Sequence, residues 1–151
     1  MDKLLNAMKI AFASEFAFYL KAHVFHWNVE GADFNDFHQM FGDIYAEVYG
    51  AIDPFAENIR KLDAYVPGKF QEMSMISGAD IEVEVPPAME MVAILLDDNE
   101  KLTKLMGMVY KMADAAGEYG LANFLAERQD AHRKHGWMLR ATLKQTGSRI
   151  Q

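Results

Sequence analysis

The chain has 151 residues, no cysteine and a formal net charge of -7, and 51% of its residues are apolar. These totals suit a single domain over residues 1–151 with a sizeable core, and they exclude disulfides, thiolate metal sites and cysteine nucleophiles. No apolar run approaches the roughly 18 residues that span a membrane, and the first residues lack a signal-peptide pattern. We therefore expect a cytoplasmic protein whose acidic surface favours cations over nucleic-acid phosphates.

Apolar side chains at three- and four-residue steps predict four long helices. The first helix spans about residues 2–27 and ends before a turn at Gly31. The second helix begins near Asp33 or Asn35, either of which can cap it, and fades near Asp63.

A proline lies inside the second helical pattern. Pro54 removes one backbone donor and predicts a kink, and Gly50 one turn earlier is placed to relieve the steric clash. In the alternative interpretation Asp53 caps a new helix that has Pro54 at its first position. The first interpretation keeps one long helix, whereas the second divides it.

A long connection, residues 64–85, separates the second helix from the third. Within it we expect a short helical turn at 70–73 and an extended loop at 81–85, which alternates like a strand but has no partner strand. The third helix follows over about 87–115 and the fourth over about 120–145. Four helices with one long second connection predict an all-α, ferritin-like four-helix bundle in which a crossover carrying a short helix joins two hairpins.

Two histidines and two carboxylates form a candidate metal site. No histidine follows a glutamate by three residues, so the Glu-x-x-His pairs of a di-iron site inside one bundle are absent. His26 ends the first helix and His38 begins the second, and the short loop between them brings both imidazoles together. Asp53 and Glu57 are four residues apart, so they share one side of the second helix. This set suits Fe(II) or Zn(II).

One chain alone cannot assemble these four ligands. His38 and Asp53 are 15 residues apart, which is roughly 22 Å along a helix axis. Two chains can, if their second helices pack antiparallel about a two-fold axis near Ala46. His26 and His38 of one subunit then meet Asp53 and Glu57 of the partner subunit, provided that all four serve one site.

Structural interpretations stand beside each of these assignments. A histidine on an apolar helix face is commonly a core residue, and an Asp/Glu pair at this spacing commonly faces solvent. We assign His23 to core packing or to support of the ligands. His132 and His135 adjoin Arg133 and Lys134, so we expect them on a solvated basic face. The methionines fall mostly at core spacing.

The stretch from residue 26 to residue 60 carries a specific pattern of residue types and intervals. It consists of His26-Trp27-Asn28-Val29-x-Gly31, Phe34, Phe37-His38, Phe41, Tyr45 and Asp53-x-x-Ala56-Glu57-x-Ile59-Arg60. This pattern resembles the Dps family (DNA-binding protein from starved cells), which are small ferritin-like cage proteins. Further similarity lies in Glu90-Met91-Val92 and in Trp137-Met138-Leu139-Arg140-Ala141.

The resemblance implies a homododecameric shell with ferroxidase sites across two-fold interfaces. The family's two histidines fall on His26 and His38, and its carboxylates fall on Asp53 and Glu57. The family typically oxidises Fe(II) with hydrogen peroxide and stores ferric mineral, which prevents hydroxyl-radical formation. Trp27 resembles the family tryptophan near the site. Two roles stay open for it, interception of radicals and core packing.

Three departures from the family pattern matter. A basic N-terminal tail is missing, which together with the charge of -7 makes direct DNA binding doubtful. Near the pore through which iron reaches the cavity, the family's acids correspond to Glu118, which is kept, and Asn123, which is an amide. Pro54 directly follows the ligand candidate Asp53, and we expect it to influence the aim of that carboxylate.

Three other functions stay open at this level. The first is a nucleoid-compacting cage whose iron chemistry is secondary, which the charge disfavours. The second is a structural helical bundle whose histidines are core residues. The third is the same cage with oxygen as oxidant or with another metal.

Overall fold

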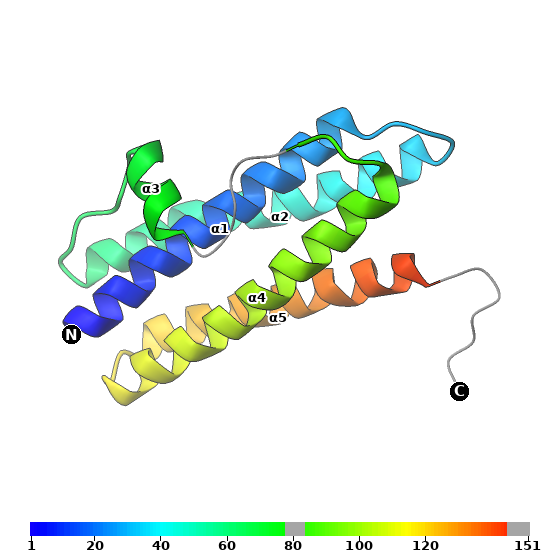
Figure 1. Ribbon diagram of the computed structural model, residues 1–151. Coiled ribbons are helices and arrows are strands. Elements are labelled where there is room, and N and C mark those ends of the chain that lie inside the picture. Colours follow the sequence, from blue (N-terminus) through cyan, green and yellow to red (C-terminus); the bar gives the residue numbers. More distant parts are fainter. Residues whose placement is uncertain (78–83, 145–151) are drawn as a thin grey trace, which may run out of the picture.

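The computed structural model describes residues 1–77 and 84–144, and over these ranges the chain forms five α-helices and no strand (Figure 1). The four long helices and one short helix are α1 (Asp2–Asn28), α2 (Phe34–Lys61), α3 (Phe70–Ile76), α4 (Ala88–Ala115) and α5 (Tyr119–Leu143). The short α3 lies on the connection between α2 and α4. This architecture confirms the predicted all-α, ferritin-like four-helix bundle with a long crossover.

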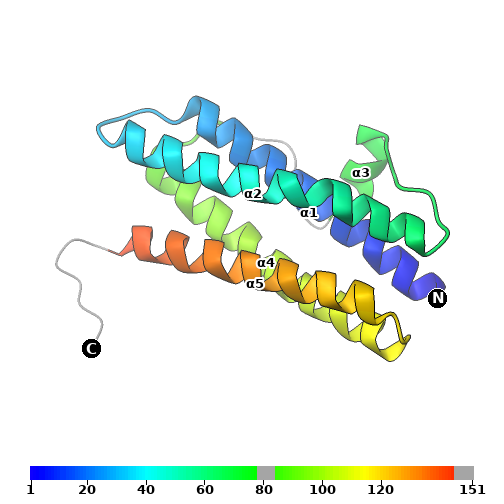
Figure 2. The same ribbon diagram turned by 180° about the vertical axis from the view of Figure 1, so that it is seen from behind.

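The bundle consists of two helix hairpins. Figures 1 and 2, which view the molecule from opposite sides, show α1 beside α2 and α4 beside α5, and α3 lies against α1. The expected extended loop at 81–85 falls largely on residues 78–83, which lie outside the described residues. None of the described helices is long and apolar enough to cross a membrane.

The core holds large side chains from all four long helices. The largest fully buried ones include Phe18, Phe25, Phe41, Phe55, Met91, Leu95, Leu102, Leu125 and Leu139. Burying a side chain of this size contributes about 1.5–3 kcal/mol. On α2 and α4 the predicted three- and four-residue steps identified the buried face, whereas on α1 the fully buried Phe18 and Phe25 lie outside the predicted steps.

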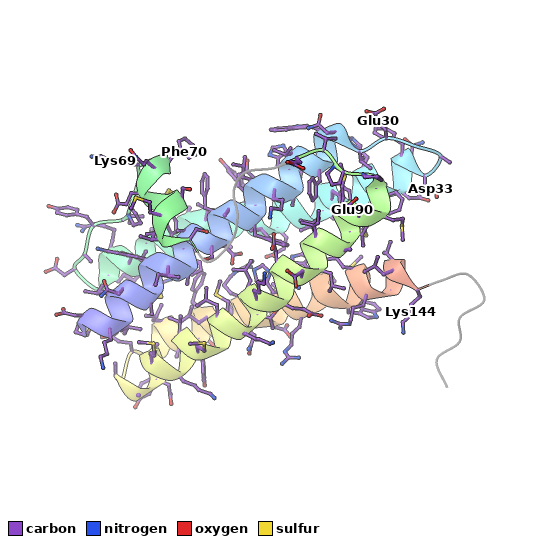
Figure 3. All side chains as sticks on the ribbon, viewed as in Figure 1. Glu30, Asp33, Lys69, Phe70, Glu90 and Lys144 are labelled. Atoms are coloured by element: carbon purple, nitrogen blue, oxygen red, sulfur yellow. The ribbon has the colours of Figure 1, made fainter. Side chains whose placement is uncertain are left out.

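Polar residues mark the start of α2 and link the two hairpins. Asp33 occupies the N-cap position of α2, as one of the two predicted candidates, although its side chain makes no capping hydrogen bond; it lies on the loop after α1 together with Glu30 (Figure 3). Between the hairpins, Lys21 Nζ on α1 forms a buried ion pair with Asp98 Oδ2 on α4 at 2.5 Å. The pair ties α1 to the opposite hairpin.

Helix α2 continues through its proline to Lys61, so the alternative in which Asp53 starts a new helix is wrong. Asn58 Nδ2 donates a hydrogen bond to the carbonyl oxygen of Pro54 at 2.9 Å. A Cβ on Gly50 would meet no atom within 4 Å, so this turn has room around the proline. The expected kink at Pro54 stays a prediction.

Candidate metal centre

The two histidines at the α1–α2 corner form a reciprocal pair. His26 lies in the last turn of α1 and His38 in the second turn of α2, and their rings stack with centroids 3.8 Å apart at 16°. His26 Nδ1 lies 2.7 Å from the carbonyl oxygen of His38, and His38 Nδ1 lies 2.7 Å from the carbonyl oxygen of His26. The predicted proximity of the two imidazoles is therefore confirmed.

These two hydrogen bonds determine which nitrogen can bind a metal. A carbonyl oxygen only accepts, so each Nδ1 carries the proton and donates it. In the neutral imidazole, the lone pair then resides on Nε2 of both rings. A hydrogen bond from the other ring nitrogen to a backbone carbonyl is the arrangement that orients histidine ligands in metal sites.

Small and aromatic side chains surround His26. A Cβ on Gly42 would come within 3.1 Å of both Cε1 and Nδ1 of the His26 ring, so the absence of a side chain at Gly42 makes room for the imidazole. Tyr45 lies 5.1 Å from His26 between ring centroids and stacks on His23 at 3.8 Å. The site is thus built on packed rings. Gly42 and Tyr45 are not among the residues predicted for the site.

His23 supports this aromatic cluster. Its Nδ1 lies 2.9 Å from the hydroxyl oxygen of Tyr19, and its ring lies 3.9 Å from that of Trp27. Burial first, and then the nearby His26, lower the pKa of His23. Trp27 itself is 58% exposed, so the core-packing interpretation of this residue is wrong.

The two candidate carboxylates lie further along α2. Asp53 and Glu57 are one turn apart and exposed, and within the described part of the chain neither makes a hydrogen bond or an ion pair. No group of three or more His, Asp or Glu side chains among the described residues is placed to hold a metal. One chain therefore presents two incomplete halves: an oriented histidine pair and a free carboxylate pair.

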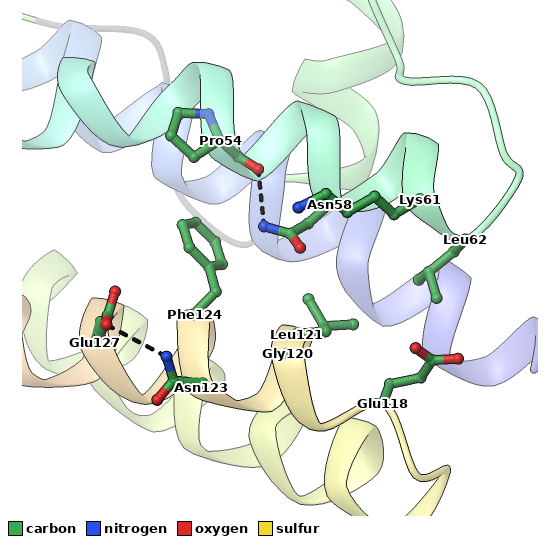
Figure 4. Close-up of a pocket in the computed structure, with 10 residues that line it drawn as sticks. All are labelled: Pro54, Asn58, Lys61, Leu62, Glu118, Gly120, Leu121, Asn123, Phe124 and Glu127. Atoms are coloured by element: carbon green, nitrogen blue, oxygen red, sulfur yellow. Dashed lines mark hydrogen bonds between the residues drawn. The ribbon is translucent and has the colours of Figure 1, made fainter.

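Two residues that the resemblance places near an iron-access pore line one cavity. Figure 4 shows this cavity of about 390 Å³ between α2 and α5, with Pro54 on one side and Glu118 on the other. Asn123 Nδ2 donates to Glu127 Oε1 at 3.4 Å. The amide at position 123 therefore adjoins a carboxylate one turn later on α5. Two acids, Glu118 and Glu127, line this cavity, and the role of Glu118 in a pore stays a prediction.

The prediction for the helix α5 histidines is wrong. His132 is fully buried and His135 is 6% exposed, because both point into the bundle while the charged neighbours Arg133 and Lys134 face outward. His132 Nε2 lies 2.9 Å from both carboxylate oxygens of Glu15. The bundle centre thus contains a polar cluster that the sequence analysis missed.

This central cluster consists of Glu15, Glu47, Arg128, His132 and His135. Arg128 donates to Glu15 at 2.6 Å and to Glu47 at 2.6 and 3.1 Å, and His135 Nε2 lies 2.8 Å from Glu47. Burial alone would raise the pKa of Glu47, but hydrogen bonds with His135 and Arg128 outweigh it and lower the pKa to about 2. Burial opposes ionisation of Glu15 as well, yet His132 and Arg128 lower its pKa. Both carboxylates are therefore ionised at neutral pH.

Comparison with known proteins agrees with this architecture. The ferritin-like domain model matches residues 5–148. The DNA protection during starvation protein of Brevibacillus brevis is 32% identical over 130 residues, which are 83% of this chain and 85% of that protein. The fold and the domain match together define a ferritin-like protein.

Two solved structures of Dps proteins are similar to this chain. Dps from Thermosynechococcus elongatus superposes with a TM-score of 0.92 at 24% identity, covering 95% of this chain and 92% of that one, and shows the shared fold. The Dps protein of Vibrio cholerae O1, described as a member of a broad superfamily of ferritin-like diiron-carboxylate proteins, superposes with a TM-score of 0.90 at 26% identity, covering 95% and 90%. The chain belongs to the Dps family of ferritin-like proteins.

Proposed function

We propose that this protein oxidises Fe(II), preferably with hydrogen peroxide, and stores the ferric product in a hollow dodecamer, at sites shared between two subunits. The observation that carries the proposal is the reciprocal His26–His38 pair, because both Nδ1 atoms donate to backbone carbonyls and the Nε2 lone pairs of two stacked rings remain for a metal. Membership of the Dps family supports iron storage and protection as the general function.

The shared site follows from where the two halves lie on α2. Asp53 and Glu57 are exposed and make no hydrogen bond or ion pair within the described part of the chain. Asp53 lies about 22 Å from His38 along α2, so the carboxylates and the histidines of one chain cannot bind the same cation. An antiparallel pair of α2 helices places Asp53 and Glu57 of the partner subunit against His26 and His38, twice per dimer. The exposed aromatic side chains of Trp27 and Tyr49 lie on the same two helices and give such an interface apolar area.

The chemistry needs nothing beyond these ligands, Fe(II) and peroxide. The imidazoles supply neutral nitrogen donors, and the carboxylates of Asp53 and Glu57 supply negative charge that stabilises the ferric product over Fe(II). Two Fe(II) ions and one H₂O₂ take up two protons and give two Fe(III) ions and two water molecules. Consuming the peroxide in a two-electron step prevents the release of hydroxyl radicals, which protects the cell. Zn(II), which accepts the same ligands, should compete for the site.

The remaining parts of the proposal concern place and partners. The protein acts in the cytoplasm as a single ferritin-like domain over residues 1–151, and the acids around the α2–α5 cavity help Fe(II) to reach the interior. Direct DNA binding is disfavoured by the net charge of -7, and a gel-shift assay at low salt would separate a nucleoid-compacting cage from an iron-storing one.

The decisive experiment is anaerobic loading with Fe(II) followed by peroxide, monitored by ferric absorbance and by a sizing column calibrated for a dodecamer. We expect rapid oxidation, with the iron co-eluting in a large particle. Glu57→Gln should slow the oxidation and leave the assembly unchanged, because the amide keeps the volume and removes the charge. Glu100→Gln, which alters an exposed acid on α4, is the matched control.

Each other outcome has a definite meaning. A Glu57→Gln variant that oxidises Fe(II) at the unaltered rate would contradict the shared site. A large particle without oxidation would support the cage and contradict the ferroxidase activity. A small iron-free particle would contradict both. Equal rates with oxygen and with peroxide would contradict the preferred oxidant only.

A further inference from the structure

The central cluster contains two carboxylate–histidine pairs from different helices. Glu15 on α1 pairs with His132 on α5, and Glu47 on α2 pairs with His135 on α5, at 2.9 and 2.8 Å respectively. The two histidines are three residues apart and point inward together. One carboxylate from each of two helices plus inward-facing histidines is the kind of ligand set that binds metals inside four-helix bundles.

A single guanidinium stands between the two pairs. The Nη2 atom of Arg128 lies 2.6 Å from Glu15 Oε1, 3.1 Å from Glu47 Oε1 and 3.5 Å from His132 Nε2. One guanidinium nitrogen thus contacts three of the four candidate ligands. The Nη1 atom contacts the other oxygen of Glu47 at 2.6 Å.

We infer that the guanidinium of Arg128 occupies the place of a divalent cation at the centre of the bundle. With Arg128 there, the surrounding Glu and His side chains are not placed to hold a metal ion; with the guanidinium removed, they become a ligand set for one. This inference goes beyond the proposed function and holds whether or not the subunit interface oxidises iron. It assigns Glu15, Glu47, His132 and His135 as a second, blocked ligand set.

The fit of the guanidinium is close but incomplete. Arg128 is 5% exposed, and among the described residues its Nε is the one buried side-chain nitrogen or oxygen without a hydrogen-bond partner. The charge of the guanidinium satisfies both carboxylates, yet one of its donors is left unsatisfied, which opposes its burial. A spherical cation would satisfy the same carboxylates without that orphan donor.

The ligand set is also reachable from solvent. A cleft of about 270 Å³ lies between α2 and α5, and Glu47 and His135 are among the residues that line it. The side chain of Glu47 is 39% exposed, whereas that of Glu15 is fully buried. A metal ion therefore has an approach through Glu47 once Arg128 no longer fills the centre.

Asn99 completes the support of the inner ligand. Its Oδ1 lies 2.8 Å from His132 Nδ1, and its Nδ2 donates to the carbonyl oxygen of His132 at 2.7 Å. The amide oxygen accepts, so Nδ1 of His132 carries a proton and Nε2 faces the cluster centre. This is the orientation that a metal-binding histidine requires.

The test uses Co(II) as the probe, in a background in which Asp53→Asn and Glu57→Gln remove the interface carboxylates. We measure bound Co(II) per chain by equilibrium dialysis and its ligand-field absorption. Adding Arg128→Ala to the background should increase the bound metal by about one ion per chain. Adding His132→Ala as well should abolish that gain. Arg128→Lys, which keeps a cation in the centre, is the matched control and should bind no additional metal.

Arg128→Ala removes the cation that pairs with the buried Glu15 and the partly exposed Glu47, and it is expected to lower the melting temperature. Stability is therefore measured with and without Co(II). If the variant folds only with Co(II), the metal has replaced the guanidinium and the inference is supported. Arg128→Gln, which keeps one donor and shortens the side chain, serves as a second vacating variant. If Arg128→Ala and Arg128→Gln neither gain Co(II) nor gain stability from it, the inference is overturned. Because every comparison is made within the altered-interface background, failure of the proposed function cannot imitate this result.

Discussion

Gly42 should control the position of the ligand candidate His26. In α2, a Cβ at this position would come within 3.1 Å of Cε1 and Nδ1 of the His26 ring, whereas ordinary contact begins near 3.4 Å. Gly42→Ala therefore has to move the ring by about 0.3 Å, since the helix backbone beneath it is fixed by its own hydrogen bonds. The movement also strains the hydrogen bond from His26 Nδ1 to the carbonyl oxygen of His38.

This substitution should lower the oxidation rate and leave the stability nearly unchanged. Alanine in place of glycine inside a helix stabilises it by about 1 kcal/mol, and a weakened hydrogen bond costs about 1 kcal/mol, so the net change in stability should be close to zero. A misplacement of roughly 1 Å in an active site can cost about 10²-fold in rate. A movement of about 0.3 Å should then slow Fe(II) oxidation by roughly fourfold on the same logarithmic scale.

Gly50→Ala is the matched control for Gly42→Ala. It lies on the same helix, two turns later, and a Cβ there would meet no atom within 4 Å. It should raise the melting temperature by about 2–4 °C and leave the oxidation rate unchanged. The assay is stopped-flow ferric absorbance at limiting Fe(II), with a sizing column to establish that both variants assemble. Equal oxidation rates in the two alanine variants would refute the reasoning, because the His26 ring would then not be a placed ligand.

Two further predictions concern the interior and the proline. The folded pKa of Glu47 is about 2 against an ordinary value of 4.5, so its contribution to stability is full above pH 4.5 and is lost as the pH falls towards 2. In urea unfolding at pH 5 and pH 3, the free energy of unfolding of Glu47→Gln should therefore depend less on pH than that of the unaltered protein. An equal dependence would count against the ion cluster. Pro54→Ala restores a backbone donor inside α2 and should raise the free energy of unfolding by up to roughly 3 kcal/mol, with Fe(II) oxidation measured in parallel to report whether the proline aims Asp53.

The helices and the histidine pair were predictable because both depend on local sequence. Three- and four-residue periodicity identifies a buried face wherever one side of a helix packs on the core, and the predicted ends of all four long helices lie within two residues of those observed. His26 and His38 are close because a short loop joins the helices that carry them. Neither result requires knowledge of which helices meet across the bundle.

The central cluster was missed because its partners come from three helices. The sequence of α5 nevertheless indicates a buried polar stripe. Three- and four-residue steps place five residues on one side of this helix: Leu125, Arg128, His132, His135 and Leu139. The leucines at both ends of this stripe are fully buried, so the charged residues between them are buried too. Charge at the adjacent positions 133 and 134 favoured the solvated interpretation, and a single sequence does not show that Glu15 and Glu47 supply the compensating carboxylates.

The two acidic sets of this chain differ in what balances them. Inside the bundle, Glu15 and Glu47 both form ion pairs with Arg128 of the same chain, and each also contacts a histidine, so both have partners before any metal arrives. On the surface, Asp53 and Glu57 have no such partner within the described chain, although they lie only two to three turns along α2 from Glu47. Arg128 fills the space between Glu15 and Glu47, whereas no positively charged side chain of the described chain pairs with Asp53 and Glu57. Both facts favour metal binding at the surface pair. In the proposed dimer, both would direct a divalent cation away from the bundle centre and towards the interface that the partner subunit's histidines complete.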